Sequence, residues 1–328
     1  MKNNMKRLLS LMMALVMVLT LCACGSAAAE KPAEEVKAPE APAATEAPAT
    51  PAETVADKKD VVIRVGCRDW TEQYILMELM AYALEQNGYT AERVPDIGGS
   101  TIVHDAMMNN EIDLAANYSG SLHSSILGYE SIYDKEEQYR IAKEEYLEKF
   151  NIVVLDESEV NNSYGLFMRK DVAAEYGIAT MSDLAKHTGE LVFANHGGWL
   201  DSSKDRLIEI YGGDFEFKEV KLFDGGLRYA SVKNREADVS TAYTTDGELY
   251  DDELILLAED GSEYPYEPYY VVPFIRGDVL EANPEIADII NGMFAKLTAE
   301  AMIELNYKAA VELEDYDVVA QEWYDANF

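Results

Sequence analysis

Strand-like and helical segments alternate along the chain after residue 60, and this alternation constrains the fold more than any other feature. Residues 61–66 form an apolar, β-branched run that ends in glycine, which is typical of a buried strand. Apolar residues at helical spacing follow at 75–84, and an Asn-Gly pair then marks a helix end. The same order recurs as far as residue 117. A β-α-β-α-β series of this kind predicts a parallel sheet covered by helices.

A second α/β series follows a polar helical stretch near 134–149 and a strand at 152–155. It comprises strands near 191–194, 217–223 and 238–242 with helices between them. Segments 254–257 and 270–275 are expected to return to the first series, and three helices close the chain. We therefore predict an α/β fold with two lobes and two crossovers, since a body of about 270 residues usually divides. Lobe I comprises 60–160 plus 249–328, and lobe II is the insertion 161–248.

The first residues have the pattern of a secretory signal, which we place at 1–23. Basic residues precede an apolar run at 8–21 that is short for a membrane span. The run ends in Leu21-Cys22-Ala23-Cys24-Gly25, which resembles a bacterial lipobox with cleavage before Cys24. A diacylglyceryl group on Cys24 would supply two chains, enough for stable anchoring. An ordinary secretory signal with incidental cysteines is the alternative.

Residues 24–59 are rich in Ala, Pro, Glu and Thr and show no apolar periodicity. Such a segment cannot bury enough surface to offset its ordering entropy, so we interpret it as a disordered tether.

The whole chain carries 61 acidic and 27 basic residues, a net charge of −34, which argues against nucleic acid as a partner. Cys67 is the only cysteine in the body after residue 59, and no Cys/His spacing suggests a metal site.

Four tyrosines lie far apart in the sequence, each beside a turn or a predicted strand end. They are Tyr118, Tyr164, Tyr243 and Tyr269. Electron-rich ring faces attract a cation that cannot donate hydrogen bonds. Any single one of the chain's 21 tyrosines is as readily explained by partial burial, so the hypothesis rests on the four together. They predict an aromatic box for a quaternary ammonium solute.

Catalytic signatures are weak. No Gly-x-Ser-x-Gly frames a serine, and the many acidic residues make carboxylate pairs expected by chance. Gly98-Gly99-Ser100-Thr101 lacks the lysine of a phosphate-binding loop and is explained by the start of a helix. We predict a protein with no catalytic residues, no cofactor and no metal. A tethered extracellular hydrolase stays open as a rival from another class.

Taken together, these segments resemble the substrate-binding lipoproteins of ABC importers for glycine betaine, choline, carnitine and related osmoprotectants. The most specific pieces are Thr71-Glu72-Gln73-Tyr74-Ile75-Leu76 and Tyr243-Thr244-Thr245-Asp246-Gly247. Other matching stretches are 65–70, 99–104, 117–121, 162–171 and 268–276, so the resemblance spans nearly all of 61–328.

The resemblance implies a type II-like periplasmic-binding-protein fold that closes on its ligand at a hinge. It implies that the four tyrosines box the trimethylammonium group, that the backbone of Asn162 helps complete the box, and that Arg68 and Ser121 face the ligand's tail. A guanidinium suits a carboxylate because it binds in bidentate fashion. The alternative for Arg68 is a surface arginine paired with an acid.

One stretch departs from the family pattern. Residues 195–204 match poorly, and no arginine precedes Arg206 where a second carboxylate-binding arginine is expected. Lys204 is a possible substitute. Trp199 either adds a wall to the box or has a packing role.

The sequence thus predicts a non-enzymatic receptor, lipid-anchored on the extracytoplasmic face of the bacterial cell membrane. It would deliver a quaternary ammonium osmolyte to an ABC permease membrane subunit. A receptor for another small cation or amino acid is the alternative within the same class.

Overall fold

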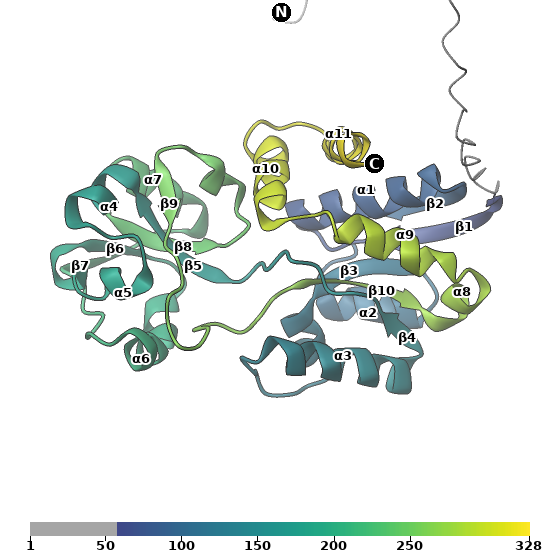
Figure 1. Cartoon of the computed structure of the whole chain (residues 1–328), viewed down its shortest axis with the longest axis horizontal. Helices are drawn as coiled ribbons and strands as arrows, with labels where there is room; N and C mark the ends of the chain where they lie inside the picture. The colour runs from purple at the N-terminus through teal and green to yellow at the C-terminus, as the bar shows by residue number, and fades with distance from the viewer. Residues whose placement is uncertain (1–57) are drawn as a thin grey trace, which may run out of the picture. The chain divides into compact units, whose positions relative to one another are not determined.

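The computed structural model of the chain describes residues 58–328 (Figure 1). The predicted signal peptide, the lipidated Cys24 and nearly all of the predicted tether lie outside the described residues. The first strand, β1 (Lys58–Gly66), starts inside the segment predicted as tether, because Lys58 pairs with Tyr89 of β2 (Tyr89–Val94). Within the described part of the chain, no helix has the length and apolar character needed to cross a membrane.

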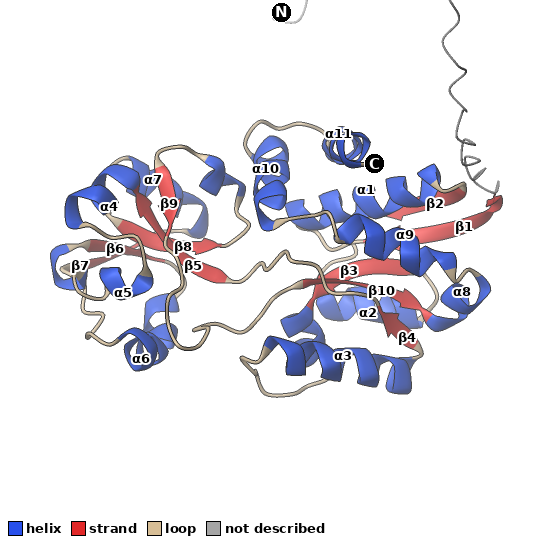
Figure 2. Ribbon diagram, in the orientation of Figure 1, coloured by secondary structure: helices blue, strands red, loops and turns tan. Residues whose placement is uncertain are grey.

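The strands form two separate five-stranded sheets (Figure 2). The first sheet has the order β2-β1-β3-β10-β4, with β3 (Leu114–Tyr118), β10 (Val271–Arg276) and β4 (Ile152–Val154). The second has the order β7-β6-β8-β5-β9, built from β7 (Glu219–Leu222), β6 (Val192–Asn195), β8 (Val239–Tyr243), β5 (Tyr164–Arg169) and β9 (Leu254–Leu256). Each sheet is the centre of one lobe, so the predicted two-lobed α/β fold is confirmed.

Both sheets are mixed, whereas the βα series predicted parallel ones. The core strands β1, β2 and β3 are parallel, as are β6, β7 and β8. In contrast, β10 runs antiparallel to β3 and β4, and β5 runs antiparallel to β8 and β9. The two exceptions are the strands that begin where the chain enters a lobe from the other one, so no crossover helix sets their direction.

The prediction that 254–257 returns to the first lobe is wrong. β9 pairs with β5 in the second sheet, with Leu256 opposite Phe167 and Leu254 opposite Arg169. Leu254 is buried in a cluster with Phe167, Val232 and other residues of the second lobe. A three-residue apolar strand carries no information about its partner, so its sequence did not decide between the sheets.

Helices cover both faces of each sheet (Figure 1). In the first lobe these are α1 (Thr71–Gln86), α2 (Ser100–Met108), α3 (Lys135–Phe150), α8 (Gly277–Ala282), α9 (Glu285–Phe294), α10 (Ala299–Ala310) and α11 (Tyr316–Asn327). In the second they are α4 (Lys170–Tyr176), α5 (Met181–Leu184), α6 (Trp199–Tyr211) and α7 (Arg228–Lys233). The largest apolar cluster joins α1, α9, α10 and α11 to one face of the first sheet, which fixes the loop after β1.

The two crossovers between the lobes lie side by side. Asn161 and Tyr270 form an isolated antiparallel bridge, and the Asn162 amide donates to the Tyr269 carbonyl over 2.9 Å. A third contact joins the lobes, because the turn η4 (Gly247–Tyr250) lies directly against α10. The rings of Tyr250 and Tyr307 lie 5.0 Å apart there.

Candidate solute-binding cleft

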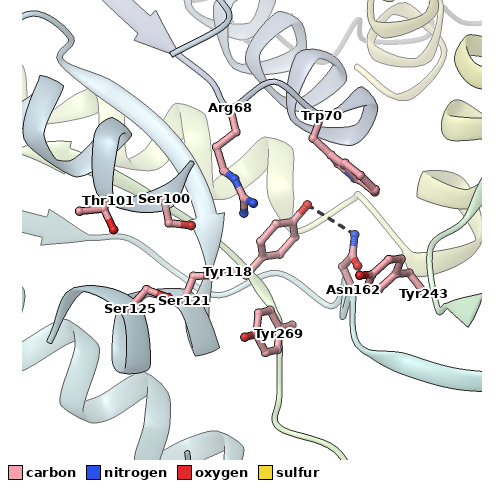
Figure 3. Close-up of a pocket in the computed structure, with 10 residues that line it drawn as sticks. All are labelled: Arg68, Trp70, Ser100, Thr101, Tyr118, Ser121, Ser125, Asn162, Tyr243 and Tyr269. Carbon is pink, nitrogen blue, oxygen red and sulfur yellow. Dashed lines mark hydrogen bonds between the residues drawn. The ribbon is translucent and has the colours of Figure 1, made fainter. Parts of the chain in front are cut away.

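A cavity of about 390 Å³ lies where strand ends, a helix start and both crossovers meet (Figure 3). The loop between β1 and α1 contributes Arg68 and Trp70, and the end of β3 contributes Tyr118. Tyr243 comes from the end of β8 in the second lobe. The remaining lining residues are Ser100, Thr101, Ser121, Ser125, Asn162 and Tyr269. Loops at strand ends on a rigid scaffold are where α/β proteins commonly place their ligands.

Aromatic rings form much of the cavity wall. The Tyr118 and Tyr269 rings have centroids 6.2 Å apart at an angle of 44°. The Trp70 indole meets the Tyr243 ring edge-on, with centroids 6.1 Å apart. The structure therefore brings three of the four predicted tyrosines to one cavity, together with a tryptophan that sequence reasoning missed. Trp70 lies in the family-like stretch 65–70, but an aromatic residue in the loop after a strand is common in cores and surfaces alike.

Tyr164 is displaced from this group. Its ring stacks on Tyr243 with centroids 5.0 Å apart and an angle of 28°, and the two hydroxyls lie 3.4 Å apart. Tyr164 lines a second cavity of about 380 Å³ that shares Asn162, Tyr243 and Tyr269 with the first. Tyr243 thus lines both neighbouring cavities, and the Tyr164 ring stacks on it from the second.

Trp199 packs inside the second lobe and does not form part of either cavity wall. It is only 7% exposed, stacks on Phe193 at 6.0 Å, and lies 6.2 Å from the Tyr164 ring. Of the two interpretations of Trp199, the packing role fits. The reason is local, because α6 begins at Trp199 and its first two residues are buried in the same apolar cluster as Phe193 of β6.

Arg68 reaches into the first cavity (Figure 3). Its guanidinium carbon lies 5.7 Å from the centroid of the Tyr118 ring. Its Nε is buried and has no hydrogen-bond partner among the described residues. The guanidinium is therefore held by a ring face, with donor capacity left for a ligand, and is not the surface ion pair that was the alternative.

Small hydroxyl residues line the side of the cavity next to Arg68. Ser121 opens the π-helical turn η1 (Ser121–Ile126) and is buried. Ser100 stands at the start of α2 and donates to Asn117 Oδ1 over 3.1 Å. The cavity thus combines a ring-rich part with a part that offers hydroxyls and one guanidinium.

The side chain of Asn162 forms hydrogen bonds within the protein and is not free to bind a solute through its Nδ2. Its Nδ2 donates to Glu72 Oε1 over 2.9 Å and lies 3.4 Å from the Tyr118 hydroxyl. The Tyr118 hydroxyl donates to the same Glu72 oxygen over 2.7 Å. Sequence reasoning did not single out Glu72, because an acidic residue in the first turn of a helix is expected from the helix dipole alone.

Tyr118 and Tyr269, which both line the cavity, are neutral phenols at physiological pH because their pKa values are raised. Burial raises the pKa of Tyr118, and the neighbouring Glu72 carboxylate raises it further. Burial also raises the pKa of Tyr269 and of Tyr164. These residues consequently present the faces of neutral rings, which suit a cation that offers only C–H groups.

The second cavity contains the first arginine after the stretch that departs from the family pattern. Arg206 lines this cavity beside Ser202 and Ser203, and its guanidinium lies 4.1 Å from the Tyr133 ring. Arg206 also pairs with Glu263 over 2.9 Å. Lys204, the other candidate, pairs with Glu216 and is absent from the residues that line the described cavities.

The described side chains include no cluster of His, Cys, Asp and Glu able to hold a metal ion. Two α/β lobes joined by adjacent crossovers, with a ring-lined cavity between them, define a two-lobed solute-binding protein of the periplasmic-binding-protein fold.

Comparison with known proteins gives the family. The chain belongs to the OpuAC family, the substrate-binding domain of ABC-type glycine betaine transport systems, whose family model matches residues 61–326. It is thus an extracytoplasmic solute-binding protein of an osmoprotectant import system and not an enzyme, as the sequence predicted.

Two curated relatives cover most of the chain. It is 31% identical over 270 residues to the carnitine transport binding protein OpuCC of Listeria monocytogenes, covering 81% of this chain and 86% of that protein. It is 30% identical over 275 residues to a glycine-betaine-binding protein of Pseudomonas aeruginosa, covering 80% and 86%. The crystal structure of a glycine betaine/carnitine/choline ABC transporter superposes with a TM-score of 0.75 at 25% identity, covering 80% of this chain and 98% of that one.

Proposed function

We propose that the chain captures glycine betaine, carnitine or choline in the first cavity and delivers it to an ABC permease. The observation that carries this proposal is the grouping of Tyr118, Tyr243, Tyr269 and Trp70 around one cavity. A desolvated cation over such rings gains about 2 kcal/mol or more from one good contact. A primary ammonium would need carboxylate or carbonyl acceptors in the wall, and the lining residues offer mainly rings and hydroxyls.

Arg68 and Ser121 are the groups we assign to the solute's tail. The unpartnered Nε of Arg68 favours a carboxylate over a hydroxyl, because charge-assisted bonds are roughly twice as strong as neutral ones. Tyr164 acts in this proposal by supporting Tyr243, and Asn162 by fixing the position of Tyr118. The second cavity, which adjoins the first at Asn162, Tyr243 and Tyr269, leaves room for a solute longer than glycine betaine.

We place the hinge in the two paired crossovers, 155–163 and 257–270. In this proposal lobe II extends through β9, beyond the boundary at 248 that the sequence suggested. Closure of one lobe on the other would exclude water from the rings and present the closed face to the permease, a hinge motion of a known kind.

We also propose that Cys24 carries the lipid and that the segment to about residue 57 tethers the body to the membrane. The support is the Leu-Cys-Ala-Cys order at the end of an apolar run. In cells, Cys24→Ala should move the processed protein from the membrane to the soluble fraction, whereas Cys22→Ala should leave it membrane-bound. Membrane retention of the processed Cys24→Ala protein would contradict the anchor.

The test of binding is calorimetric titration with glycine betaine, carnitine and choline, with lysine as a primary ammonium control. We expect saturable binding of at least one quaternary solute and none of lysine. Tyr243→Ala should weaken binding by about tenfold, equivalent to roughly 1–2 kcal/mol. Tyr129→Ala is the matched control, since Tyr129 is 40% exposed and absent from the cavity wall. Tighter binding of lysine would instead favour a receptor for another small cation or amino acid.

A further inference from the structure

Glu72 is a buried carboxylate directly behind the aromatic cavity. It lies in the first turn of α1 and is 1% exposed. Three neutral donors from three distant segments converge on it: the Tyr118 hydroxyl at 2.7 Å, Asn162 Nδ2 at 2.9 Å and Asn306 Nδ2 at 3.0 Å. Such convergence fixes the carboxylate beside the cavity wall.

No cationic side chain within residues 58–328 forms an ion pair with this carboxylate. None of the ion pairs between described side chains involves Glu72. The guanidinium of Arg68 lies over the Tyr118 ring, with its carbon 5.7 Å from the ring centroid, and it is not paired with Glu72. Burying a charge without a counter-ion is costly, and hydrogen bonds alone compensate it only in part. A positive group that enters the cavity would therefore gain from the unneutralised charge.

The hydrogen bond between Tyr118 and Glu72 transmits that charge to the cavity. A phenol that donates to a carboxylate becomes more electron-rich, because hydrogen bonds in a low-dielectric interior polarise their partners. The Tyr118 ring lines the cavity, so its face becomes more negative where a cation would lie. The field of the carboxylate itself is also weakly screened there.

We propose that Glu72 is a specificity-determining residue of the cleft: through Tyr118 it selects a cationic head group over a neutral one of the same shape. This inference rests on the proposed function, since it concerns the same cavity. Glu72 need not touch the solute. Glu72 gives the cavity its preference for a positively charged solute, whereas the rings determine which solute shapes fit.

The experiment compares a quaternary ammonium solute with its carbon isostere, which has the same shape without the charge. The pairs are choline with 3,3-dimethyl-1-butanol, and glycine betaine with 3,3-dimethylbutanoate; the isosteres are measured by displacement. In Glu72→Gln we expect the dissociation constant of the cation to rise about tenfold and that of its isostere to change less than twofold. A purely structural role would weaken both equally, so an unchanged ratio in a folded Glu72→Gln protein overturns the proposal.

Asn306→Ala provides the structural control. It removes one donor to Glu72 and one to the Thr245 carbonyl but leaves the charge in place. It should lower the melting temperature without changing the ratio of cation to isostere. A change in that ratio as large as in Glu72→Gln would show that lost packing, and not lost charge, sets the preference, and would also overturn the proposal.

A second comparison, between two Tyr→Phe variants, tests the proposal even if Glu72→Gln does not fold. Tyr118→Phe removes the hydroxyl that bonds the carboxylate, whereas Tyr243→Phe removes one whose neighbour is the neutral Tyr164 hydroxyl. We expect Tyr118→Phe to weaken cation binding by three- to tenfold and Tyr243→Phe by less than twofold. Equal losses would contradict the role of Glu72. If the wild-type protein bound no quaternary solute, the proposed function itself would fail, which is distinct from an unchanged ratio.

Discussion

The indole of Trp70 meets the ring of Tyr243 edge-on at 6.1 Å, and this contact joins the first lobe to the second beside the cavity. Trp70 stands at the start of α1 and remains 46% exposed, whereas Tyr243 ends β8. The position of the indole at the edge of the cavity makes it a ring that a bound cation and the opposite lobe can share.

Trp70→Ala should therefore weaken binding of the preferred quaternary solute by about tenfold, since one cation–π contact is worth roughly 1–2 kcal/mol. Trp70→Phe keeps a ring in place and should lose much less. Titration calorimetry gives the dissociation constant of the solute for both variants and for the wild type. Wild-type affinity in Trp70→Ala would show that the indole is only a surface residue.

Arg68→Gln should change which solute is preferred. We expect glycine betaine or carnitine to bind the wild type more tightly than choline, because only their tails carry a carboxylate for the guanidinium. In the variant this ratio should fall, with choline little affected. Arg235→Gln is the control, because Arg235 is an exposed residue paired with Asp171. A wild type that prefers choline, or a ratio that Arg68→Gln leaves unchanged, contradicts the assignment.

Gly247→Ala should destabilise the contact between η4 and α10. A Cβ at Gly247 would lie 2.6 Å from the Tyr307 amide nitrogen and 2.7 Å from the Asn306 carbonyl carbon, so the backbones must separate. Overpacking of this kind costs about 1–3 kcal/mol. We expect a melting temperature lower by several degrees, at about 2–4 °C per kcal/mol for a body of this size.

Gly292→Ala is the matched control for that comparison. A Cβ at Gly292 meets nothing within 4 Å, and the residue lies inside α9. Alanine in a helix interior is favoured over glycine by about 0.5–1 kcal/mol. Thermal melts should therefore move in opposite directions for the two variants. If both variants changed the melting temperature by the same amount and in the same direction, η4 and α10 would not be in close contact at Gly247.

Glu259 should make stability depend on pH. Burial raises the pKa of its carboxyl from 4.5 to about 7, although the Tyr211 hydroxyl donates to it and opposes the shift. The folded protein then holds the proton more tightly than the unfolded chain. The free energy of unfolding consequently falls as pH rises from about 4.5 through 7, and is constant with respect to this group above that range.

Glu259→Gln should remove this dependence. We expect the variant to be more stable than wild type at pH 8, with the difference shrinking toward pH 4.5. Urea unfolding at several pH values measures it, and Glu312→Gln, at an exposed position, is the control. A wild type that gains stability over the same interval relative to Glu259→Gln would show that the carboxylate is well solvated in the folded state.

The alternation of strands and helices was sufficient to predict two α/β lobes, and the positions of Tyr118, Tyr243 and Tyr269 were enough to predict a ring-lined site. Both depend on local patterns, since apolar periodicity and residue type are set within a few positions. In contrast, the direction of a strand and the strand with which it pairs are not encoded within a few neighbouring residues. Nothing within the three residues of β9 distinguishes the second sheet from the first, and only the burial of Leu254 beside Phe167 decides it.

The sequence by itself determined the class of the fold, the family and the kind of side chains that line the cleft. Only the tertiary structure decided which of those side chains share a cavity. It placed Trp70 beside Tyr243, moved Tyr164 to the neighbouring cavity and buried Trp199 in a core. It also brought Asn306 to Glu72, 234 positions away in the chain. Contacts over such separations depend on how lobes and helices pack, and packing is a property of the whole fold that no short segment encodes.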